Sequence, residues 1–244
     1  MIYMIKASAL SQIQKEKIWT IYKSNYSVCK KQFYDSIPEN STIILYAIKR
    51  KANIVGFAIA DVQTLQIDGK NKRIIYTTRL VIEPKYRGNK FVEMSGFLFF
   101  IKEKIKNPSS DYYWLFTAIS YPGYLMMARN FKEFWPAPNW QTPPEISKIK
   151  NEASKYFYKD YYDQETGTAN LPLGLDFDPF AHSGSNDDSE FLRFFKEMVP
   201  YANQGQALVC LVPVDLSSFI ALTFRALLSL GRKVSIRNLD RKAS

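Results

Sequence analysis

Three cations lie close together in a segment that could bind phosphate: Lys85, Arg87 and Lys90. Gly88 stands among them and permits a turn that a side chain would hinder. Residues 74–82, just before the turn, are almost all β-branched, aromatic or aliphatic, which predicts a strand covered on both faces. Where a strand leads into a helix, free backbone N–H groups lie at the positive end of the helix dipole. The residue types and their spacing therefore favour a phosphate or diphosphate site.

The elements on either side of this turn follow from local signals. Pro84 has no N–H to donate, so it ends the strand and holds Glu83 extended. A helix over residues 91–106 is predicted because apolar residues recur there at helical spacing, namely Phe91, Met94, Leu98, Ile101 and Ile105. The glycine-containing turn therefore lies directly before a helix.

The run LVIEPKYRGN, residues 80–89, resembles the acyl-CoA-binding segment of the GNAT superfamily of N-acetyltransferases. In that family a hydrophobic triplet pairs with the pantetheine arm of coenzyme A as an added strand would, and the turn amides hold the pyrophosphate. The resemblance implies that Leu80, Val81 and Ile82 face pantetheine. Lys90 stands where the family usually has a second Gly or Ala. The residues implied to surround the pyrophosphate are Arg87, Gly88, Asn89, Lys90 and Phe91, with the cation Lys85 beside them.

The resemblance implies an α/β (α+β) fold of the GNAT-like acyl-CoA N-acyltransferase type. Its central, mostly antiparallel twisted sheet is splayed between the fourth and fifth strands and flanked by helices. Periodicity and turn residues predict a matching order of elements: strands at residues 1–6, 42–48, 54–66, 74–82 and 111–119, and helices beginning at Ser11, Lys30 and about Phe91. Ser11 and Gln14 fit a capping box, and Asp68 with Gly69 is a hairpin turn signal. The first helix has an apolar face of Ile13, Ile18, Ile21, Tyr22 and Tyr26.

We expect a single domain over residues 1–244. Its core lies at about 1–136 and 190–231, with an insertion at about 137–189 and a basic tail at about 232–244. The insertion contains a predicted helix over residues 145–158 and a turn-rich stretch, and is expected to form a substrate-facing flap or a partner surface. The expected later elements are a helix over residues 191–199 capped by Ser189 or Asp188, a strand over 207–214 and a helix over 219–230.

The composition points to a negatively charged partner. The net charge of +10 fits a polyphosphate cofactor, nucleic acid or an anionic membrane. No apolar run reaches the roughly 18–20 residues that a membrane span needs. The two cysteines, Cys29 and Cys210, do not make a disulfide framework. We expect both thiols to be buried and the protein to be cytoplasmic.

Residue counts exclude several kinds of site. The chain has one histidine, His182, expected in an exposed polar loop, so a two-histidine zinc motif is impossible and no metal is predicted. The sequence contains no G-x-x-x-x-G-K-[ST] loop for nucleotide phosphates and no G-x-S-x-G motif of a serine hydrolase.

Acyl transfer from a thioester to an amine needs a base for the amine proton, an acid for the thiolate and N–H groups for the carbonyl. In the histone-acetyltransferase branch of the GNAT superfamily the base is a glutamate on the fourth strand, and the matching position here is Tyr76. In many relatives the acid is a tyrosine, and its matching position is near Ala128. Both catalytic positions are therefore changed. Tyr124 is then the candidate acid, and Glu83 or Asp61 the candidate base through water.

Three functions follow as hypotheses. The first is an acyl-CoA-dependent N-acyltransferase that uses acetyl-CoA or another acyl-CoA and acts on an amine of a small molecule, peptide or protein. The second is a protein of the same fold without catalysis, which binds a partner. The third is an acyltransferase directed to nucleic acid, such as a tRNA.

Overall fold

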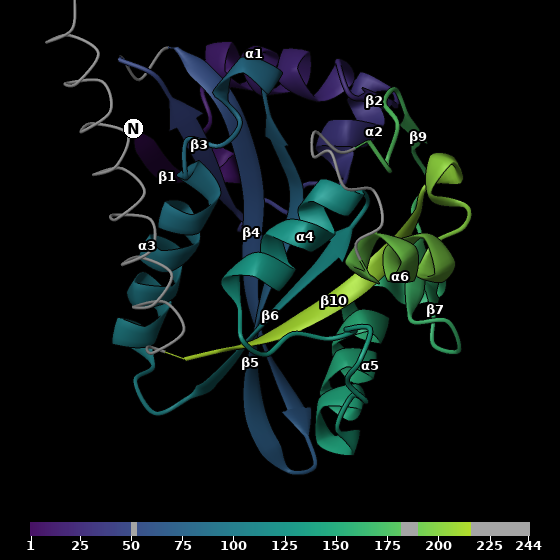
Figure 1. Cartoon of the computed structure of the whole chain (residues 1–244). Helices are drawn as coiled ribbons and strands as arrows, with labels where there is room; N and C mark the ends of the chain where they lie inside the picture. The colour runs from purple at the N-terminus through teal and green to yellow at the C-terminus, as the bar shows by residue number, and fades with distance from the viewer. Residues whose placement is uncertain (50–52, 182–189, 216–244) are drawn as a thin grey trace, which may run out of the picture.

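The fold is known from a computed structural model that describes residues 1–49, 53–181 and 190–215. Within these ranges one twisted sheet runs in the order β1-β3-β4-β5-β6-β10-β8-β7 (Figure 1). Every neighbouring pair is antiparallel except β5 with β6, which is parallel. The strands are β1 (Ile2–Lys6), β3 (Thr42–Ala47), β4 (Ile54–Ile67), β5 (Lys70–Ile82), β6 (Asp111–Ala118), β7 (Tyr162–Asp163), β8 (Thr168–Asn170) and β10 (Gln206–Val214). A separate small sheet pairs β2 (Tyr26–Ser27) with β9 (Gly174–Leu175). The expected α/β architecture with a large, mostly antiparallel sheet is confirmed.

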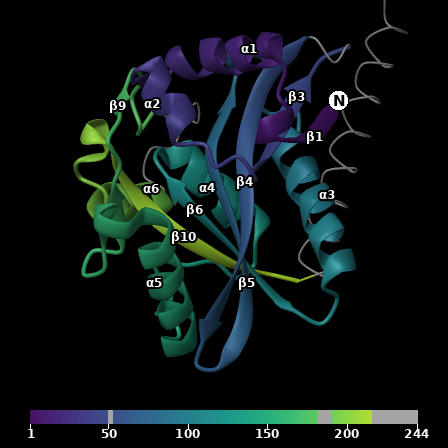
Figure 2. The same cartoon turned by 180° about the vertical axis from the view of Figure 1, so that it is seen from behind.

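The helices lie on both faces of the sheet (Figures 1 and 2). They are α1 (Gln12–Lys23), α2 (Lys30–Asp35), α3 (Phe91–Lys106), α4 (Tyr121–Asn130), α5 (Pro144–Tyr158) and α6 (Glu190–Met198), with short 3-10 turns η1 (Ala7–Ala9), η2 (Pro84–Tyr86), η3 (Lys159–Tyr161) and η4 (Ala202–Gln204). The side chains of β6 alternate between the two faces and show which helices cover each. Tyr112 and Phe116 pack towards α3 and α4, whereas Leu115 packs towards α5. On β4, Phe57 packs under α1 and Ile67 packs with α5. Helices α1, α2 and α5 therefore share one face, and α3, α4 and α6 the other.

The β4–β5 hairpin has the predicted turn. Asp68 and Gly69 both have positive φ, 51° and 70°, as a type I′ turn requires. The strands run antiparallel up to this turn, with Ile67 opposite Lys70. Asn, Asp and Gly tolerate this backbone region better than other residues do, so the local sequence was enough to predict the hairpin.

The predicted capping box at the start of α1 is present. The side chain of Ser11 accepts from the backbone N–H of Gln14, and the side chain of Gln14 accepts from the N–H of Ser11. Ile18 and Ile21 are buried as expected, but Ile13 is 79% exposed. Ile13 lies five positions before Ile18, which on a helix turns it roughly 140° away from that buried residue.

Helix α3 has the predicted bounds, yet it carries two apolar stripes. The sheet-facing stripe has the apolar residues Phe91, Phe99 and Phe100, and the polar residues Ser95 and Glu103 are buried with them. Of the residues whose spacing predicted the helix, Met94, Leu98 and Ile105 are exposed, by 42%, 47% and 75%. Periodicity located the helix correctly but could not say which stripe packs on the sheet.

The segment expected as an insertion is built into the sheet where it is described. On α5, Ile149 and Ala153 pack against Leu115 of β6 and Val209 of β10. Strand β8 pairs with β10, and β7 pairs with β8. Helix α5 is therefore part of the core and not a detached flap.

Some expectations concern single side chains or lie outside the described residues. Cys210 is buried as expected, but Cys29 is exposed, because it precedes α2 and its sulfur accepts from the N–H of Gln32. His182, the cap at Ser189 or Asp188 and the helix over 219–230 lie outside the described residues. No helix within the described ranges is long and apolar enough to cross a membrane.

Candidate functional site

Strands β5 and β6 separate at one end of the sheet. They are the fourth and fifth strands of the large sheet in chain order, and they pair from Lys72 opposite Asp111 to Thr77 opposite Phe116. We call this last pair the apex. Beyond it, β5 runs on to Ile82 paired only with β4, and the rest of β6 pairs only with β10. Residues 78–82 of β5, here called the open edge, therefore lack a strand neighbour on one side, as the predicted splay requires.

A β-bulge shapes the open edge. Thr78 lies opposite Ile59 and Val81 opposite Phe57, so two residues of β5 face one residue of β4. One of the two is Arg79, whose φ is +50°. The extra residue shifts the alternation of side chains: Val81 is buried on the α1 side, whereas Leu80 is 38% exposed. Of the triplet expected to face pantetheine, Val81 thus turns its side chain towards α1, and its backbone lies opposite Phe57 of β4.

The turn after β5 offers backbone donors. Gly88 and Lys90 have positive φ, 77° and 58°. Among the described residues, the N–H groups of Gly88, Asn89 and Lys90 donate to no acceptor. A Cβ built on Gly88 would meet nothing within 4 Å, so the space in front of the turn is open. Unpaired N–H groups at the start of a long helix, here α3, are a recurrent anion-binding arrangement.

The three cations do not converge freely on this turn. Arg87 donates from Nε to the carbonyl of Ile82 at 3.1 Å, which fixes the turn on the strand end. The ammonium of Lys90 lies 3.0 Å from the carboxylate of Glu93, in the first turn of α3. Lys85 lies over the ring of Tyr86, 4.8 Å from its centroid. The expected convergence is thus replaced by a structural Arg87, a Lys90 paired with Glu93, and an exposed Lys85.

Lys90 also explains the departure from the family pattern. Its left-handed backbone is a conformation that glycine adopts without strain and that costs other residues about 1–2 kcal/mol. The chain therefore keeps the backbone shape of a second glycine but places an ion pair there.

An apolar cavity of about 40 Å³ lies between the open edge and α3. Thr77 and Leu80 of β5 line one wall, and Val92 and Phe99 of α3 line another. Trp114 of β6 closes the apex on this side and donates from Nε1 to the Thr77 hydroxyl at 2.7 Å. The cavity therefore opens beside the same edge that lacks a strand partner.

On the α5 face, the apex carries a group of hydroxyls: Tyr76, Thr78, Thr117 and Tyr158, here called the hydroxyl cluster. The ring of Tyr158 meets that of Tyr76 edge-on, with centroids 5.5 Å apart. The hydroxyl of Tyr158 is buried near Thr117 and Tyr76, yet it makes no hydrogen bond within the described residues. Burial raises the pKa of Tyr158 well above its usual value and also raises the pKa of Tyr76. Both phenols therefore stay protonated near neutral pH, and burial makes each a weaker acid than an exposed tyrosine.

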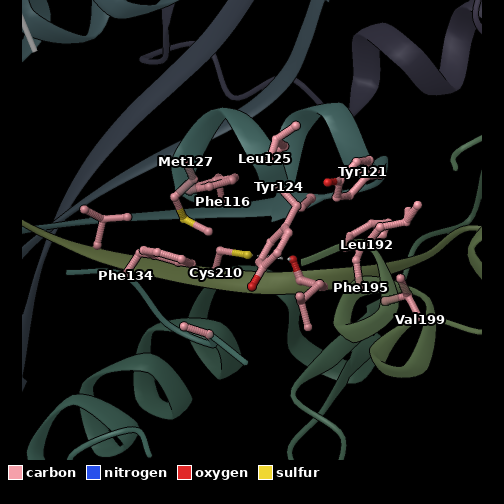
Figure 3. Close-up of a cluster of buried hydrophobic side chains, with 14 of the residues drawn as sticks. Phe116, Tyr121, Tyr124, Leu125, Met127, Phe134, Leu192, Phe195, Val199 and Cys210 are labelled. Carbon is pink, nitrogen blue, oxygen red and sulfur yellow. Dashed lines mark hydrogen bonds between the residues drawn. The ribbon is translucent and has the colours of Figure 1, made fainter. Parts of the chain in front are cut away.

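Of the other candidates, Tyr124 lies deep in the core. It is fully buried, and its hydroxyl donates to the carbonyl of Pro136 at 3.0 Å. Its ring stacks on Phe195, with centroids 5.5 Å apart. Figure 3 shows Tyr124 among apolar side chains beside Cys210. To serve as an acid, Tyr124 would have to break the bond to Pro136.

The two carboxylate candidates are both engaged. Glu83 pairs with Lys17 of α1 at 3.0 Å. Asp61 accepts from the backbone N–H of Val62 at 2.8 Å and lies opposite Tyr76 on the neighbouring strand. Asp61 is thus the carboxylate that the sheet places beside the hydroxyl cluster.

Sequence reasoning missed Tyr158 and Thr117. Tyr158 ends α5, and only the packing of that helix on the sheet brings it beside β5 and β6. No motif or spacing in the chain signals this contact.

No family model and no curated protein matches this chain. Solved structures show a weak likeness. A probable N-acyltransferase from Enterococcus faecalis V583 is similar over 54% of this chain and 33% of its own length, with 11% identity and a TM-score of 0.39. The ribosomal-protein-S18-alanine N-acetyltransferase from Escherichia coli is similar over 88% of this chain and 96% of its own, with 10% identity and a TM-score of 0.37. Glucosamine-6-phosphate N-acetyltransferase from Arabidopsis thaliana is similar over 59% of this chain and 99% of its own, with 8% identity and a TM-score of 0.38. The functional proposal therefore rests on the geometry of the splay.

Proposed function

We propose that this protein transfers an acyl group from coenzyme A to an amine. The observation that carries the proposal is the open edge of β5, which leads into a turn with three unpaired backbone N–H groups. The resemblance of residues 80–89 to the acyl-CoA-binding segment of the GNAT superfamily supports the same assignment from the sequence.

The binding role divides between the open edge and the turn. A pantetheine arm carries amides that can pair with exposed strand backbone, and residues 78–82 offer such backbone. A diphosphate is an acceptor-rich anion that suits the N–H groups of Gly88, Asn89 and Lys90 at the α3 N-terminus. Lys85 is the exposed cation beside them, and Arg87 holds the turn in place.

The reaction needs little from the protein beyond positioning and proton transfer. The acyl-CoA substrate supplies an activated acyl group, which moves from sulfur to the amine nitrogen. Backbone N–H groups of the open edge polarise the carbonyl. The free hydroxyl of Tyr158 gives the proton that the departing sulfur needs, and Tyr76 orients it through their ring contact. Asp61 takes the amine proton through water, and that proton restores the phenol.

Two of the candidates expected from the sequence have weaker support for these roles. Glu83 is held by Lys17, and Tyr124 is committed to Pro136. Both stay predictions, testable by Glu83→Gln and Tyr124→Phe in the same assay as Tyr158→Phe.

Titration calorimetry with acetyl-CoA tests the binding role. We expect Gly88→Trp to abolish binding, because an indole would fill the space in front of the turn amides. Gly69→Trp is the matched control: Gly69 also has positive φ, 70°, and open space around it, but it lies in the β4–β5 hairpin. Circular dichroism establishes that both variants fold. Equal binding by the two variants would mean that the phosphate turn is misplaced.

A protein of this fold without catalysis is the second candidate. Two observations favour it. The hydroxyl of the candidate acid Tyr124 is already hydrogen-bonded to Pro136, and the Lys90–Glu93 ion pair partly neutralises the positive charge of the turn. Binding of acetyl-CoA without thiol release across a panel of amines would support it. The third candidate, a tRNA-directed acyltransferase, predicts salt-dependent retention of the chain on RNA.

A further inference from the structure

The cavity beside the open edge is placed to receive part of an acyl donor. It shares Thr77 and Leu80 with β5, so it begins where the thioester end of a bound pantetheine arm would lie. Its far side is formed by α3, whose N-terminus follows the phosphate turn. One donor could therefore reach the turn, the open edge and the cavity together.

The lining of the cavity selects an aliphatic group. Most of its residues are apolar, including Ile44, Ala58, Ile75 and Phe99. Its polar atoms already have partners: Tyr46 and Ser95 hydrogen-bond each other at 3.1 Å, and Thr77 accepts from Trp114. A polar or charged group in this space would lose its hydration without gaining a partner.

The size of the cavity limits the length of that group. A water molecule needs about 10–15 Å³ of space measured in this way, so about 40 Å³ takes roughly three groups of that size. An acetyl group would leave most of this space empty. A chain of about ten carbons would exceed it.

We propose that the preferred donor is an acyl-CoA of about four to six carbons, whose methylene groups fill this cavity. The inference rests on the proposed function and specifies its substrate class. It assigns acyl-chain length selection to two lining residues on facing walls, Ala58 of β4 and Val92 of α3.

Titration calorimetry on the full chain tests the proposal with CoA, acetyl-, butyryl-, hexanoyl- and decanoyl-CoA. Burial of each methylene tightens binding about fourfold, so hexanoyl-CoA should bind at least about tenfold more tightly than acetyl-CoA. Decanoyl-CoA should gain nothing further. Equal affinity for acetyl- and hexanoyl-CoA would overturn the inference while leaving the proposed function intact. If CoA itself does not bind, the proposed function fails and the inference fails with it.

A matched pair of variants locates the effect. Ala58→Val places two extra methyl groups in the cavity and should reduce the hexanoyl preference to about threefold or less, with acetyl-CoA affinity nearly unchanged. Ala60→Val adds the same groups on the same strand face but not at the lining, and should keep the full preference. Loss of the preference in both variants, or in neither, would overturn the assignment of the cavity.

Ala58 and Ala60 are 4% and 1% exposed, so either variant could unfold through overpacking. In that case Val92→Phe serves as the test variant, because Val92 lines the cavity from α3 and is only half-buried. This variant should also reduce the hexanoyl preference, and an unchanged preference would count against the proposal in the same way.

Discussion

Two buried tyrosines on opposite faces of the sheet differ in whether their hydroxyl makes a hydrogen bond. Tyr124 of α4 donates its hydroxyl to Pro136, and aromatic rings surround it. Tyr158 of α5 is equally buried, but its hydroxyl has no partner within the described residues. A satisfied polar group contributes to stability, whereas an unsatisfied one costs about 1–3 kcal/mol. The hydrogen bond of Tyr124 fits a structural residue, whereas the unpaired hydroxyl of Tyr158 is what our proposal assigns to the reaction.

The largest expected effect tests this difference through turnover. Tyr158→Phe should lower the rate of acyl transfer by about 100-fold, the usual loss when a general acid is removed. The affinity for acetyl-CoA should change little, because the rest of the binding surface is intact. Tyr162→Phe near the same helix end, whose hydroxyl donates to Asn151, is the control and should retain turnover.

Removing the two hydroxyls should have the opposite order of effects on stability: the loss at Tyr124 should matter more than the loss at Tyr158. Tyr124→Phe leaves the Pro136 carbonyl unsatisfied and should lower the free energy of unfolding by about 1–3 kcal/mol in a denaturant titration. Tyr158→Phe should leave it unchanged or slightly higher, because the removed hydroxyl had no bond. If Tyr124→Phe instead abolished turnover in a stable protein, the two roles would be reversed.

The last expected effect concerns the exclusion of water from the core around Tyr124, to which Cys210 belongs. Burial raises the pKa of the Cys210 thiol from 9.0 to about 12. Above pH 9 the unfolded chain loses this proton and the folded chain keeps it, so the Cys210 contribution to stability declines as pH rises. The slope approaches about 1.4 kcal/mol per pH unit. A Cys210→Ala variant should show a flatter decline between pH 9 and 11.

The sequence was most informative where the signal is local. The bounds of α3 and the turn at Asp68 and Gly69 came from periodicity and turn chemistry. The phosphate turn was found because glycine and its neighbouring cations are adjacent in the chain. These features depend on residues that are neighbours in sequence, so no tertiary information was needed.

Features that depend on packing escaped prediction. The inward stripe of α3 could not be chosen, because Phe99 on one side and Leu98 on the other are both apolar. Cys29 looked like a buried thiol but precedes α2 at the surface. The placing of Tyr158 beside Tyr76 joins residues 82 positions apart, and nothing in either local sequence encodes it.

The parallel pairing of β5 and β6 has an electrostatic consequence. Because both strands run in one direction, both deliver the chain to the same end of the sheet, where α3 and α4 then begin. The partial positive charges of two helices consequently face one gap. Such a focused field should speed the capture of a polyanion from solution, and the association rate should fall steeply as salt is added.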